Sequence, residues 1–380
     1  MKAVIAAAQT GGHINPGLAI ANKIKSEEPD SEIIFIGTDS GLEADLVPRE
    51  GYELKTVNCF GLSRSFKLST IKKGIQTLHS VSEAKKILKE FSPDVVIGTG
   101  GFITWVVCKA AQKLHIPYLV HESNVLPGKA TQWVSKKADK ILVGFEESKD
   151  RLPKAKKVVF TGNPTKVVKL DLTEQEKEDK KQENGYNVEK PLVLVFGGSQ
   201  GAKNINKAMV GIINSVVSGD STIPYQVMWA VGPKNYDGVK AELESNNIDV
   251  ENIKDIKVLP YIYNMGEMMN IADMVVCRSG AMTVTETEKI GVPAIFIPYP
   301  FAAENHQEFN ARTVEKQGGA KVLLDDQITS TILNSMICEM ISDKENLESM
   351  AKSIAAMSAS NVEDNIYNEV KDSVLQNIEK

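Results

Sequence analysis

The sequence predicts an α/β protein with two doubly wound, parallel-sheet domains. Two observations support this prediction: short, continuously apolar runs alternate with longer helical patterns, and the alternation occurs in two successive series. Continuous apolar strands separated by helices indicate a parallel sheet that is covered on both faces. A chain of 380 residues is also too long for one ordinary core, so two domains fit its length.

The predicted strands fall into two groups of six. The first group is Lys2–Ala8, Glu32–Gly37, Asp94–Gly98, Tyr118–His121, Lys140–Val143 and Val158–Thr161. The second group is Leu192–Phe196, Gln226–Val231, Ile256–Leu259, Met274–Cys277, Ala294–Pro298 and Ala320–Leu323. "TGNPTK" (161–166) ends the first group and marks the domain boundary. The charged segment 170–190 is interpreted as a solvated linker or surface helix, and the chain after Asp325 reads as helical.

Composition excludes several classes of protein. Apolar and charged contents of 42% and 24% are those of a globular chain, and a net charge of −5 gives no overall attraction to nucleic acid. The four cysteines are widely spaced, which favours reduced thiols in a cytoplasmic protein, and Cys277 reads better as a buried small side chain than as a nucleophile. No run approaches the length of a membrane span, and "MKAVIAAA" reads better as a first strand than as a signal peptide.

Four glycine-rich turns follow predicted strands. They are "AQTGGHINPG", "GTGGF" (98–102), "FGGSQGAKNIN" (196–206) and "CRSGAMTVTE" (277–286). Ligands of open parallel sheets bind beyond the carboxyl ends of the strands, and a helix N-terminus after a glycine turn suits a phosphate. A single such turn can simply reverse the chain, but four together predict an anionic ligand in a cleft between the domains.

The turns indicate a nucleotide diphosphate that is bound without metal. "GGSQGAKN" misses the Walker pattern, the first turn lacks GxGxxG, and no Asp-x-Asp supplies metal ligands. Neutral donors such as Ser199 and Gln200 can hold a diphosphate beside a helix N-terminus. We therefore expect no cofactor and no metal.

Several polar residues can carry chemistry, each beside a structural alternative. His13 is either a general base or a capping histidine, since an imidazole titrates near neutral pH. His121 reads as a buried structural residue, whereas Asn124 can orient a sugar hydroxyl. Glu286 can accept two ribose hydroxyls or lie solvated on a helix. The polar segment 298–311 suits sugar recognition.

The segment 61–91 is locally basic and carries interleaved apolar residues. Such a surface can lie on anionic lipid headgroups. An ordinary helix pair with a solvated face explains the pattern equally well.

Taken in order, "TGGHINPGLAIA", "HESNVLPG", "GNP", "GGSQGA", "CRSGAMTVTE" and "HQEFNA" resemble the MurG family of bacterial N-acetylglucosaminyltransferases, which convert lipid I to lipid II. The resemblance covers roughly residues 1–325. It implies a GT-B fold of two facing Rossmann-like domains with a cleft between them, and inverting transfer without metal. It implies an acceptor-binding, membrane-associating domain over 1–163, a UDP-GlcNAc-binding domain over 164–345, and C-terminal helices over 346–380, the last packing on the N-terminal domain. The implied partners are UDP-GlcNAc, undecaprenyl-linked lipid I and the cytoplasmic face of the bacterial inner membrane.

The resemblance also implies roles for individual residues. His13 is the implied base, with Thr10, Gly11 and Gly12 beside the diphosphate and acceptor, and Asn124 near the acceptor or sugar. On the donor side, Ser199 meets the diphosphate and the backbone at Ile262 reads the uracil. The remaining implied contacts are phosphate and ribose at Ala281, Met282, Thr283 and Glu286, and the GlcNAc hydroxyls at Gln307.

Three positions depart from the family pattern. Ala8 and Gln9 stand where the family usually has glycines, and Lys166 stands at a binding position that commonly holds arginine, which loses the bidentate fork. The third departure is "FITWVV" after the "GTGG" turn. Three alternatives remain: a glycolipid-forming transferase that uses diacylglycerol, a UDP-GlcNAc 2-epimerase, and a non-catalytic protein that docks on membranes and binds nucleotide sugar.

Overall fold

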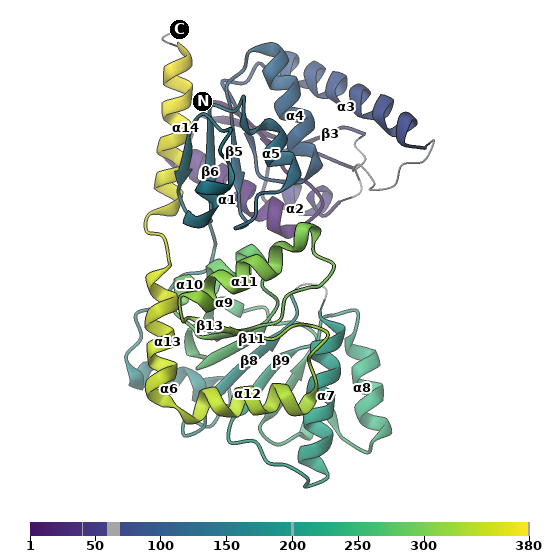
Figure 1. Cartoon of the computed structure of the whole chain (residues 1–380), viewed down its shortest axis with the longest axis vertical. Helices are drawn as coiled ribbons and strands as arrows, with labels where there is room; N and C mark the ends of the chain where they lie inside the picture. Colours follow the sequence, from purple (N-terminus) through teal and green to yellow (C-terminus); the bar gives the residue numbers. More distant parts are fainter. Residues whose placement is uncertain (40, 59–68, 199–200, 379–380) are drawn as a thin grey trace. The chain divides into compact units, whose positions relative to one another are not determined.

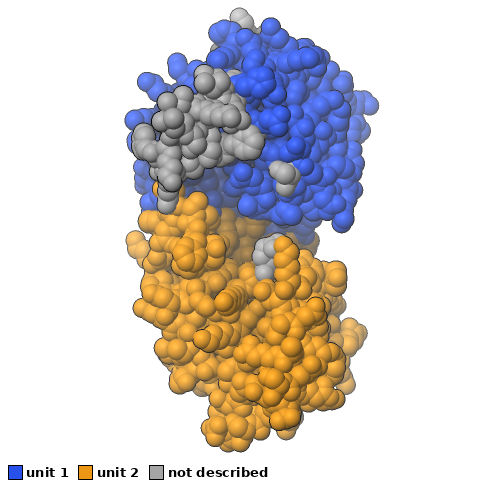
Figure 2. Space-filling model, turned by 90° about the vertical axis from the view of Figure 1, so that its right-hand side faces the viewer, with its two compact units in different colours: residues 1–166, 359–380 blue, residues 167–358 orange. Residues whose placement is uncertain are grey.

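The computed structural model describes residues 1–39, 41–58, 69–198 and 201–378. The chain forms two compact units, which Figure 2 colours separately. Unit 1 comprises residues 1–166 and 359–380, and unit 2 comprises residues 167–358. Each unit contains one parallel sheet flanked by helices (Figure 1).

The sheet of unit 1 has strand order β3-β2-β1-β4-β5-β6-β7, and every pairing is parallel. The strands are β1 (Lys2–Ala6), β2 (Glu32–Gly37), β3 (Glu53–Thr56), β4 (Val95–Gly98), β5 (Tyr118–Glu122), β6 (Lys140–Val143) and β7 (Val158–Phe160). Six of them lie where apolar runs predict strands. The prediction missed β3, because this edge strand has the polar sequence ELKT and a largely exposed surface.

Helices cover both faces of this sheet. They are α1 (Gly11–Glu27), α2 (Glu43–Arg49), α3 (Ser69–Phe91), α4 (Gly101–Leu114), α5 (Lys129–Ser135) and α14 (Val362–Ile378), with a 3-10 helix, η1, at Glu146–Arg151. One apolar core joins the sheet to α1, α2 and α14, and a second core joins the opposite face to α3, α4 and α5. The side chains of β1 are buried on both faces of the sheet, and successive residues point alternately into the two cores, as a doubly covered sheet requires.

The sheet of unit 2 has strand order β10-β9-β8-β11-β12-β13, again entirely parallel. The strands are β8 (Leu192–Phe196), β9 (Gln226–Ala230), β10 (Ile256–Leu259), β11 (Met274–Cys277), β12 (Ala294–Phe296) and β13 (Ala320–Val322). All six confirm the predicted second group.

The helices of unit 2 also lie on both sides of their sheet (Figure 1). They are α6 (Glu174–Glu183), α7 (Lys203–Val217), α8 (Tyr236–Ser245), α9 (Met265–Ile271), α10 (Ala281–Ile290), α11 (His306–Lys316), α12 (Ser330–Ser342) and α13 (Lys344–Ala356), with 3-10 helices η2 (Val250–Asn252) and η3 (Ala303–Asn305). The core under β8 and β9 is closed by α7, α8 and α12. The charged segment forms α6, a surface helix that begins with a Thr173–Glu176 capping box.

The chain is helical from Ser330 to Ile378 apart from short breaks, as predicted. The last helix, α14, belongs to unit 1, where Asp364 pairs with Lys23 of α1 and Glu369 pairs with the buried Lys140 of β6. Within the described residues, no helix combines the length and apolar character needed to cross a membrane.

Candidate active site

The four glycine-rich turns lie in two pairs, one pair in each unit. In unit 1 they follow β1 and β4, and in unit 2 they follow β8 and β11. The strands of each pair are hydrogen-bonded neighbours at the point where the strand order reverses direction. Open α/β sheets bind ligands at this switch point, so each unit places its glycine turns where a ligand site is expected.

His13 joins the two turns of unit 1. It lies in the first turn of α1, half-buried, and its ring contacts the turn after β4. A Cβ added to Gly100 would overlap His13 Cδ2 and lie 2.9 Å from Nε2. Gly100 has φ 123° and ψ 176°, a conformation open only to glycine. The Thr99 hydroxyl donates to the His13 carbonyl at 2.7 Å, which ties the same two turns through the backbone.

The β1–α1 turn presents the start of a 17-residue helix. Thr10 is its N-cap, and both Thr10 and Gly12 are exposed, as an anion at a helix N-terminus requires. Gln9, where the resemblance leads us to expect glycine, has φ 77°, the left-handed conformation that glycine adopts at little cost. Its N–H donates to Glu43 at 2.8 Å.

Asn124 follows β5, the next strand in the sheet after β4. The buried Glu122 carboxylate accepts hydrogen bonds from the Asn124 backbone N–H and side-chain amide at 3.1 and 3.2 Å. Glu122 also accepts from Gly128 N–H and the Thr131 hydroxyl, so the whole turn after β5 is organised around one carboxylate.

Lys166 has an ion pair with Glu50, the C-cap residue that follows α2, at 2.5 Å. This pairing holds the pKa of Glu50 below its usual range. The described contact of Lys166 is therefore with Glu50, not with the glycine turns.

In unit 2, the turn after β8 packs against the end of β9. Gly201 and Gly232 both have positive φ, and a Cβ on Gly232 would lie 2.7 Å from Gly201 Cα. Ser199, the predicted diphosphate contact, lies outside the described residues, as does Gln200. The turn leads into α7, whose N-cap is Ala202.

The second turn of unit 2 begins α10. Gly280 is its N-cap, Ala281 is buried, and Met282, Thr283 and Glu286 are half-buried on its first two turns. A ligand at this helix end would therefore meet the backbone of Ala281 rather than its side chain. The Ser279 hydroxyl donates to the Gln307 carbonyl at 2.8 Å, so α11 begins beside the same turn.

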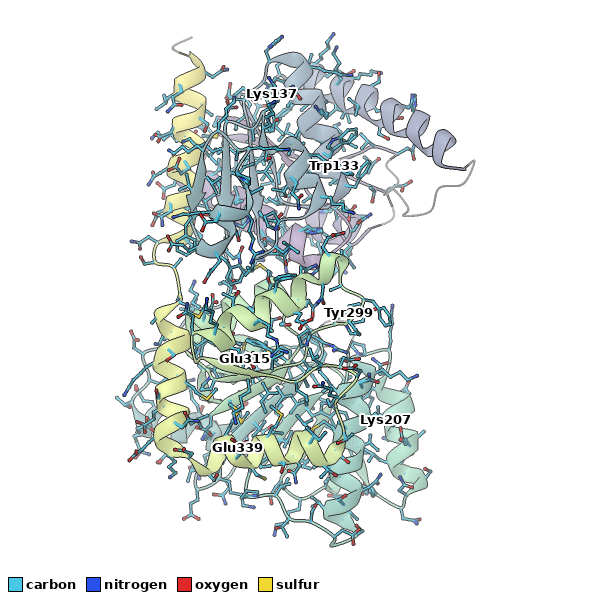
Figure 3. The ribbon with its side chains drawn as sticks, in the orientation of Figure 1. Trp133, Lys137, Lys207, Tyr299, Glu315 and Glu339 are labelled. Atoms are coloured by element: carbon cyan, nitrogen blue, oxygen red, sulfur yellow. The ribbon has the colours of Figure 1, made fainter. Side chains whose placement is uncertain are left out.

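Gln307 lies in the first turn of α11, after the loop that follows β12, and Ile262 lies in the loop that follows β10. Gln307 Oε1 accepts the Tyr299 N–H at 2.9 Å, which fixes the orientation of the side-chain amide. Figure 3 labels Tyr299, which lies in the loop after β12. The Ile262 side chain is 2% exposed, while Tyr263 beside it is 90% exposed. Because the Ile262 side chain is buried, it holds the chain in place at this position. Ile262 can therefore contact a ligand only through its main-chain N–H and C=O groups.

An ion pair that sequence reasoning missed braces the turns of unit 2. Arg278, between β11 and α10, lies 2.5 Å from Asp325 Oδ1, and it donates to the carbonyls of Ile297 and Pro298 at 3.0 and 3.1 Å. Asp325 Oδ2 accepts from Asn204 at 2.6 Å, in the first turn of α7. The cluster thus connects both glycine turns of unit 2.

Two structural interpretations from the sequence are confirmed. His121 is fully buried, its Nε2–H donates to the Gly162 carbonyl at 3.1 Å, and burial lowers its pKa. Cys277 is also fully buried, and burial together with the Glu286 charge raises the pKa of its thiol, so it is not poised as a nucleophile.

Comparison with known proteins supports the sequence resemblance. The glycosyltransferase family 28 N-terminal domain matches residues 3–143, and the family 28 C-terminal domain matches residues 192–366. A protein of Acetivibrio thermocellus named UDP-N-acetylglucosamine–N-acetylmuramyl-(pentapeptide) pyrophosphoryl-undecaprenol N-acetylglucosamine transferase is 40% identical over 98% of both chains. A Caldanaerobacter subterraneus protein of the same name is 38% identical over 98% of this chain and 99% of its own. This chain belongs to the MurG family.

Solved structures agree with this family and fold. The crystal structure of Acinetobacter baumannii MurG is similar with a TM-score of 0.76 and 25% identity, and the match covers 98% of this chain and 99% of that one. The two parallel-sheet units are therefore those of a GT-B fold. A Neisseria meningitidis UDP-GlcNAc 2-epimerase bound to UDP-GlcNAc matches with a TM-score of 0.63 at 15% identity over 99% of this chain and 100% of that one, which shows a shared fold alone.

Proposed function

We propose that this chain transfers GlcNAc from UDP-GlcNAc to the 4-hydroxyl of the MurNAc sugar of lipid I, and so forms lipid II for peptidoglycan. The observation that carries the proposal is the match to MurG transferases at 36–40% identity, which in four relatives spans 97–98% of this chain. The match includes both units, and each unit has glycine turns at its switch point. Fold alone would not separate a transferase from an epimerase.

We assign the donor to unit 2. The N-termini of α7 and α10 and the glycine turns before them offer backbone N–H groups to the diphosphate, with Ser199 as a further donor. Glu286 would hold the ribose hydroxyls and the Ile262 backbone the uracil. Because Gln307 Oε1 accepts the Tyr299 N–H, the amide nitrogen is the group that Gln307 would offer to GlcNAc. This set of donors neutralises a diphosphate without a metal.

We assign the acceptor to unit 1. Thr10, Gly11 and Gly12 would receive the polar head of lipid I at the start of α1, with Asn124 on the neighbouring strand end. The flexible side chain of Lys166 would leave its ion pair with Glu50 and bind a phosphate of the acceptor instead. His13 would take the proton of the attacking hydroxyl.

In the proposed reaction the acceptor O4 loses its proton to His13 and attacks the anomeric carbon of GlcNAc. The bond from that carbon to the diphosphate oxygen breaks, and its electron pair leaves with UDP. Attack from the face opposite the diphosphate inverts the configuration. Helix N-termini and N–H groups of unit 2 stabilise the charge that grows on the diphosphate, since they are oriented before the reaction begins.

Labelled UDP-GlcNAc and a lipid I analogue test the proposal. We expect labelled lipid II with a β linkage, and we expect His13→Ala to lower kcat by about 10²–10⁴-fold while UDP still binds, because a general base contributes on that order. Formation of UDP-ManNAc without acceptor would indicate the epimerase, and transfer to diacylglycerol but not to lipid I would indicate the glycolipid enzyme. A His13→Ala variant with the wild-type rate would contradict the assigned base.

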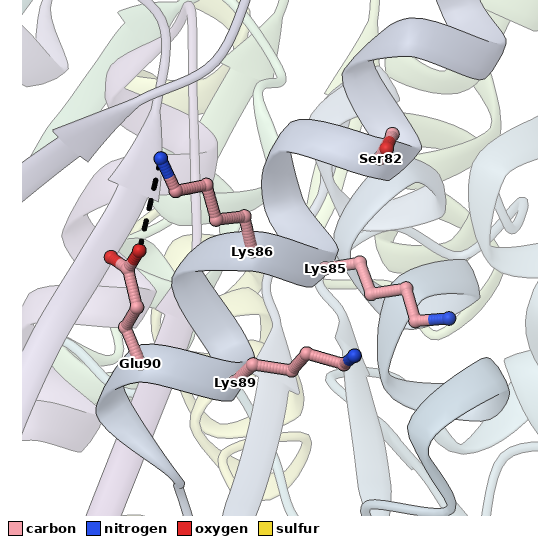
Figure 4. A pocket seen from close by; sticks show the side chains of 5 residues that line it. All are labelled: Ser82, Lys85, Lys86, Lys89 and Glu90. Atoms are coloured by element: carbon pink, nitrogen blue, oxygen red, sulfur yellow. Dashed lines mark ion pairs between the residues drawn. The ribbon is translucent and has the colours of Figure 1, made fainter.

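We also propose that unit 1 docks on the anionic cytoplasmic face of the membrane, where the lipid tail of the acceptor lies. Ser82, Lys85, Lys86, Lys89 and Glu90 of α3 line a shallow depression of about 440 Å³ (Figure 4). Lys86 pairs with Glu90 at 3.9 Å. An aromatic cluster lies on α4, which packs against α3, and on α5, which packs against α4; Trp133 of this cluster, on α5, is 47% exposed (Figure 3). The part of the predicted basic segment at 61–68 lies outside the described residues.

Sedimentation with vesicles containing phosphatidylglycerol measures this docking. Each lysine near an anionic surface contributes about 1 kcal/mol, so Lys85→Glu with Lys89→Glu should weaken binding by about thirtyfold or more. Lys207→Glu with Lys316→Glu, on exposed positions of unit 2, is the matched charge control. Equal loss in both double variants would contradict docking through α3.

A further inference from the structure

One peptide group connects a buried carboxylate to the candidate base. The N–H of the Ala8–Gln9 peptide donates to Glu43 Oε2 at 2.8 Å. The carbonyl oxygen of the same peptide lies 3.1 Å from His13 Nδ1. Glu43, the peptide and His13 thus form a continuous hydrogen-bonded chain.

Glu43 occupies a fixed position at the start of α2. Its side chain is completely buried, and Oε1 accepts the Thr38 N–H at 2.9 Å and the Thr38 hydroxyl at 2.6 Å. Burial alone would raise the pKa of Glu43, but the hydrogen bonds from Thr38 and the Gln9 N–H outweigh it, and the pKa lies below its usual range. The group is therefore a carboxylate at neutral pH. A Cβ on Gly37 would lie 2.8 Å from Glu43 Cγ, so the pocket leaves little room for another rotamer.

The backbone at Gln9 is strained in the conformation that makes this contact. A side chain at φ 77° costs about 1 kcal/mol or more, and such a conformation persists only where surrounding contacts hold it. The hydrogen bond to Glu43 is one such contact. It aligns the Ala8–Gln9 peptide, and the alignment sets the direction of the Ala8 carbonyl.

The contact with Ala8 selects one tautomer of His13. A carbonyl oxygen can only accept, so Nδ1 carries a proton when it bonds to Ala8, and the basic lone pair is then on Nε2. A carboxylate on the N–H side of a peptide polarises that peptide and increases the negative charge on its oxygen. The imidazolium form of His13 gains from this charge more than the neutral form does.

We infer that Glu43 is a positioning residue for His13, acting through the Ala8–Gln9 peptide to orient the imidazole and increase its basicity. The inference rests on the proposed role of His13 as the base. Its logic is that of a carboxylate that orients a catalytic histidine, with a peptide group interposed.

Within the described part of the chain, the groups that face His13 include some from three elements. Its own turn presents the Ala8 carbonyl and the Thr10 hydroxyl, the latter 3.3 Å from Nδ1. The turn after β4 presents Gly100 and Gly101, which carry no charge. Glu43, from α2, is the carboxylate that reaches this turn through the Gln9 N–H.

Glu43→Gln removes the charge and keeps the size. We expect kcat to fall about tenfold, as for other partners that orient a functional imidazole, with little change in KM for UDP-GlcNAc. The acidic limb of the pH–rate profile and the His13 Cε1–H titration should both move to lower pH, because the imidazolium loses its support. Asp45→Asn, an exposed carboxylate of the same helix that pairs with Arg49, is the matched control and should change neither. A folded Glu43→Gln protein with wild-type kcat and an unchanged His13 titration would overturn the inference.

A second measurement uses the unmodified protein and no substrate. Because one peptide joins the two side chains, the Gln9 amide ¹⁵N and Ala8 carbonyl ¹³C resonances should titrate with the same midpoint as His13. Resonances that do not follow His13 would overturn the inference even if Glu43→Gln fails to fold. If the resonances follow His13 while His13→Ala remains fully active, the coupling is supported and the proposed base role fails, so the two failures are distinguishable.

Discussion

The switch points of the two units have the same topology but differ in the group that connects their glycine turns. In unit 1, between β1 and β4, the connecting group is the imidazole of His13, which lies over glycines. In unit 2, between β8 and β11, it is the Arg278–Asp325 ion pair with Asn204. An imidazole is the type of side chain that can exchange a proton near neutral pH, whereas a guanidinium keeps its charge at any working pH.

This difference matches the division of labour that we propose. Activation of a hydroxyl needs a group that changes its protonation state, and the acceptor side has one. A leaving diphosphate needs donors that stay in place, and the donor side has turns braced by a permanent charge. The difference also shows that equal glycine content in two turns does not imply equal chemistry.

Among the variants that test this comparison of the two switch points, Gly100→Ala has the largest expected effect. Gly100→Ala forces a side chain into a glycine-only conformation and into the His13 ring. We expect kcat for transfer to fall about a hundredfold, since displacement of a catalytic group by about 1 Å costs this much. Steady-state kinetics with saturating UDP-GlcNAc measures it, and UDP affinity should be unchanged.

Gly51→Ala is the matched control for backbone strain. Gly51 has φ 83° in the same unit, but a Cβ there meets nothing within 4 Å. We expect it to cost about 1 kcal/mol in the free energy of unfolding and to leave kcat unchanged. If both variants lost activity equally, strain rather than contact with His13 would explain the loss at Gly100, and the comparison of the two switch points would lose its basis.

How much the sequence could predict differs between scaffold and site. Twelve strands carry continuous apolar runs and were predicted, whereas β3 was missed because an exposed edge needs no such run. The glycine turns were predicted because clusters of glycine directly after an apolar run can be recognised from neighbouring residues alone. Glu43 and Asp325 were missed because their contacts, with Gln9 and with Arg278, join distant parts of the chain and follow only from the parallel sheet order.

A smaller effect is predicted for Asp325→Asn in unit 2. The change leaves Arg278, whose side chain is only 11% exposed, without its counter-charge, and it weakens the link to Asn204. Loss of one partner of a largely buried pair should lower the free energy of unfolding by about 2–4 kcal/mol. The donor turns should loosen, so KM for UDP-GlcNAc should rise about tenfold, or about 1.4 kcal/mol of binding energy, while kcat at saturation changes less.

Asp326→Asn separates the brace from a general loss of negative charge. Asp326 is the adjacent, exposed carboxylate, so the same charge change there should alter neither the thermal midpoint nor KM. An unchanged KM in Asp325→Asn would contradict the predicted support of donor binding, and a lower KM would mean that Arg278 acts on the donor directly once released. In the case of a lower KM, the Arg278–Asp325 ion pair would restrain donor binding rather than support it. Unit 2 would then resemble unit 1, since in each unit a carboxylate would modulate the functional cationic or basic side chain.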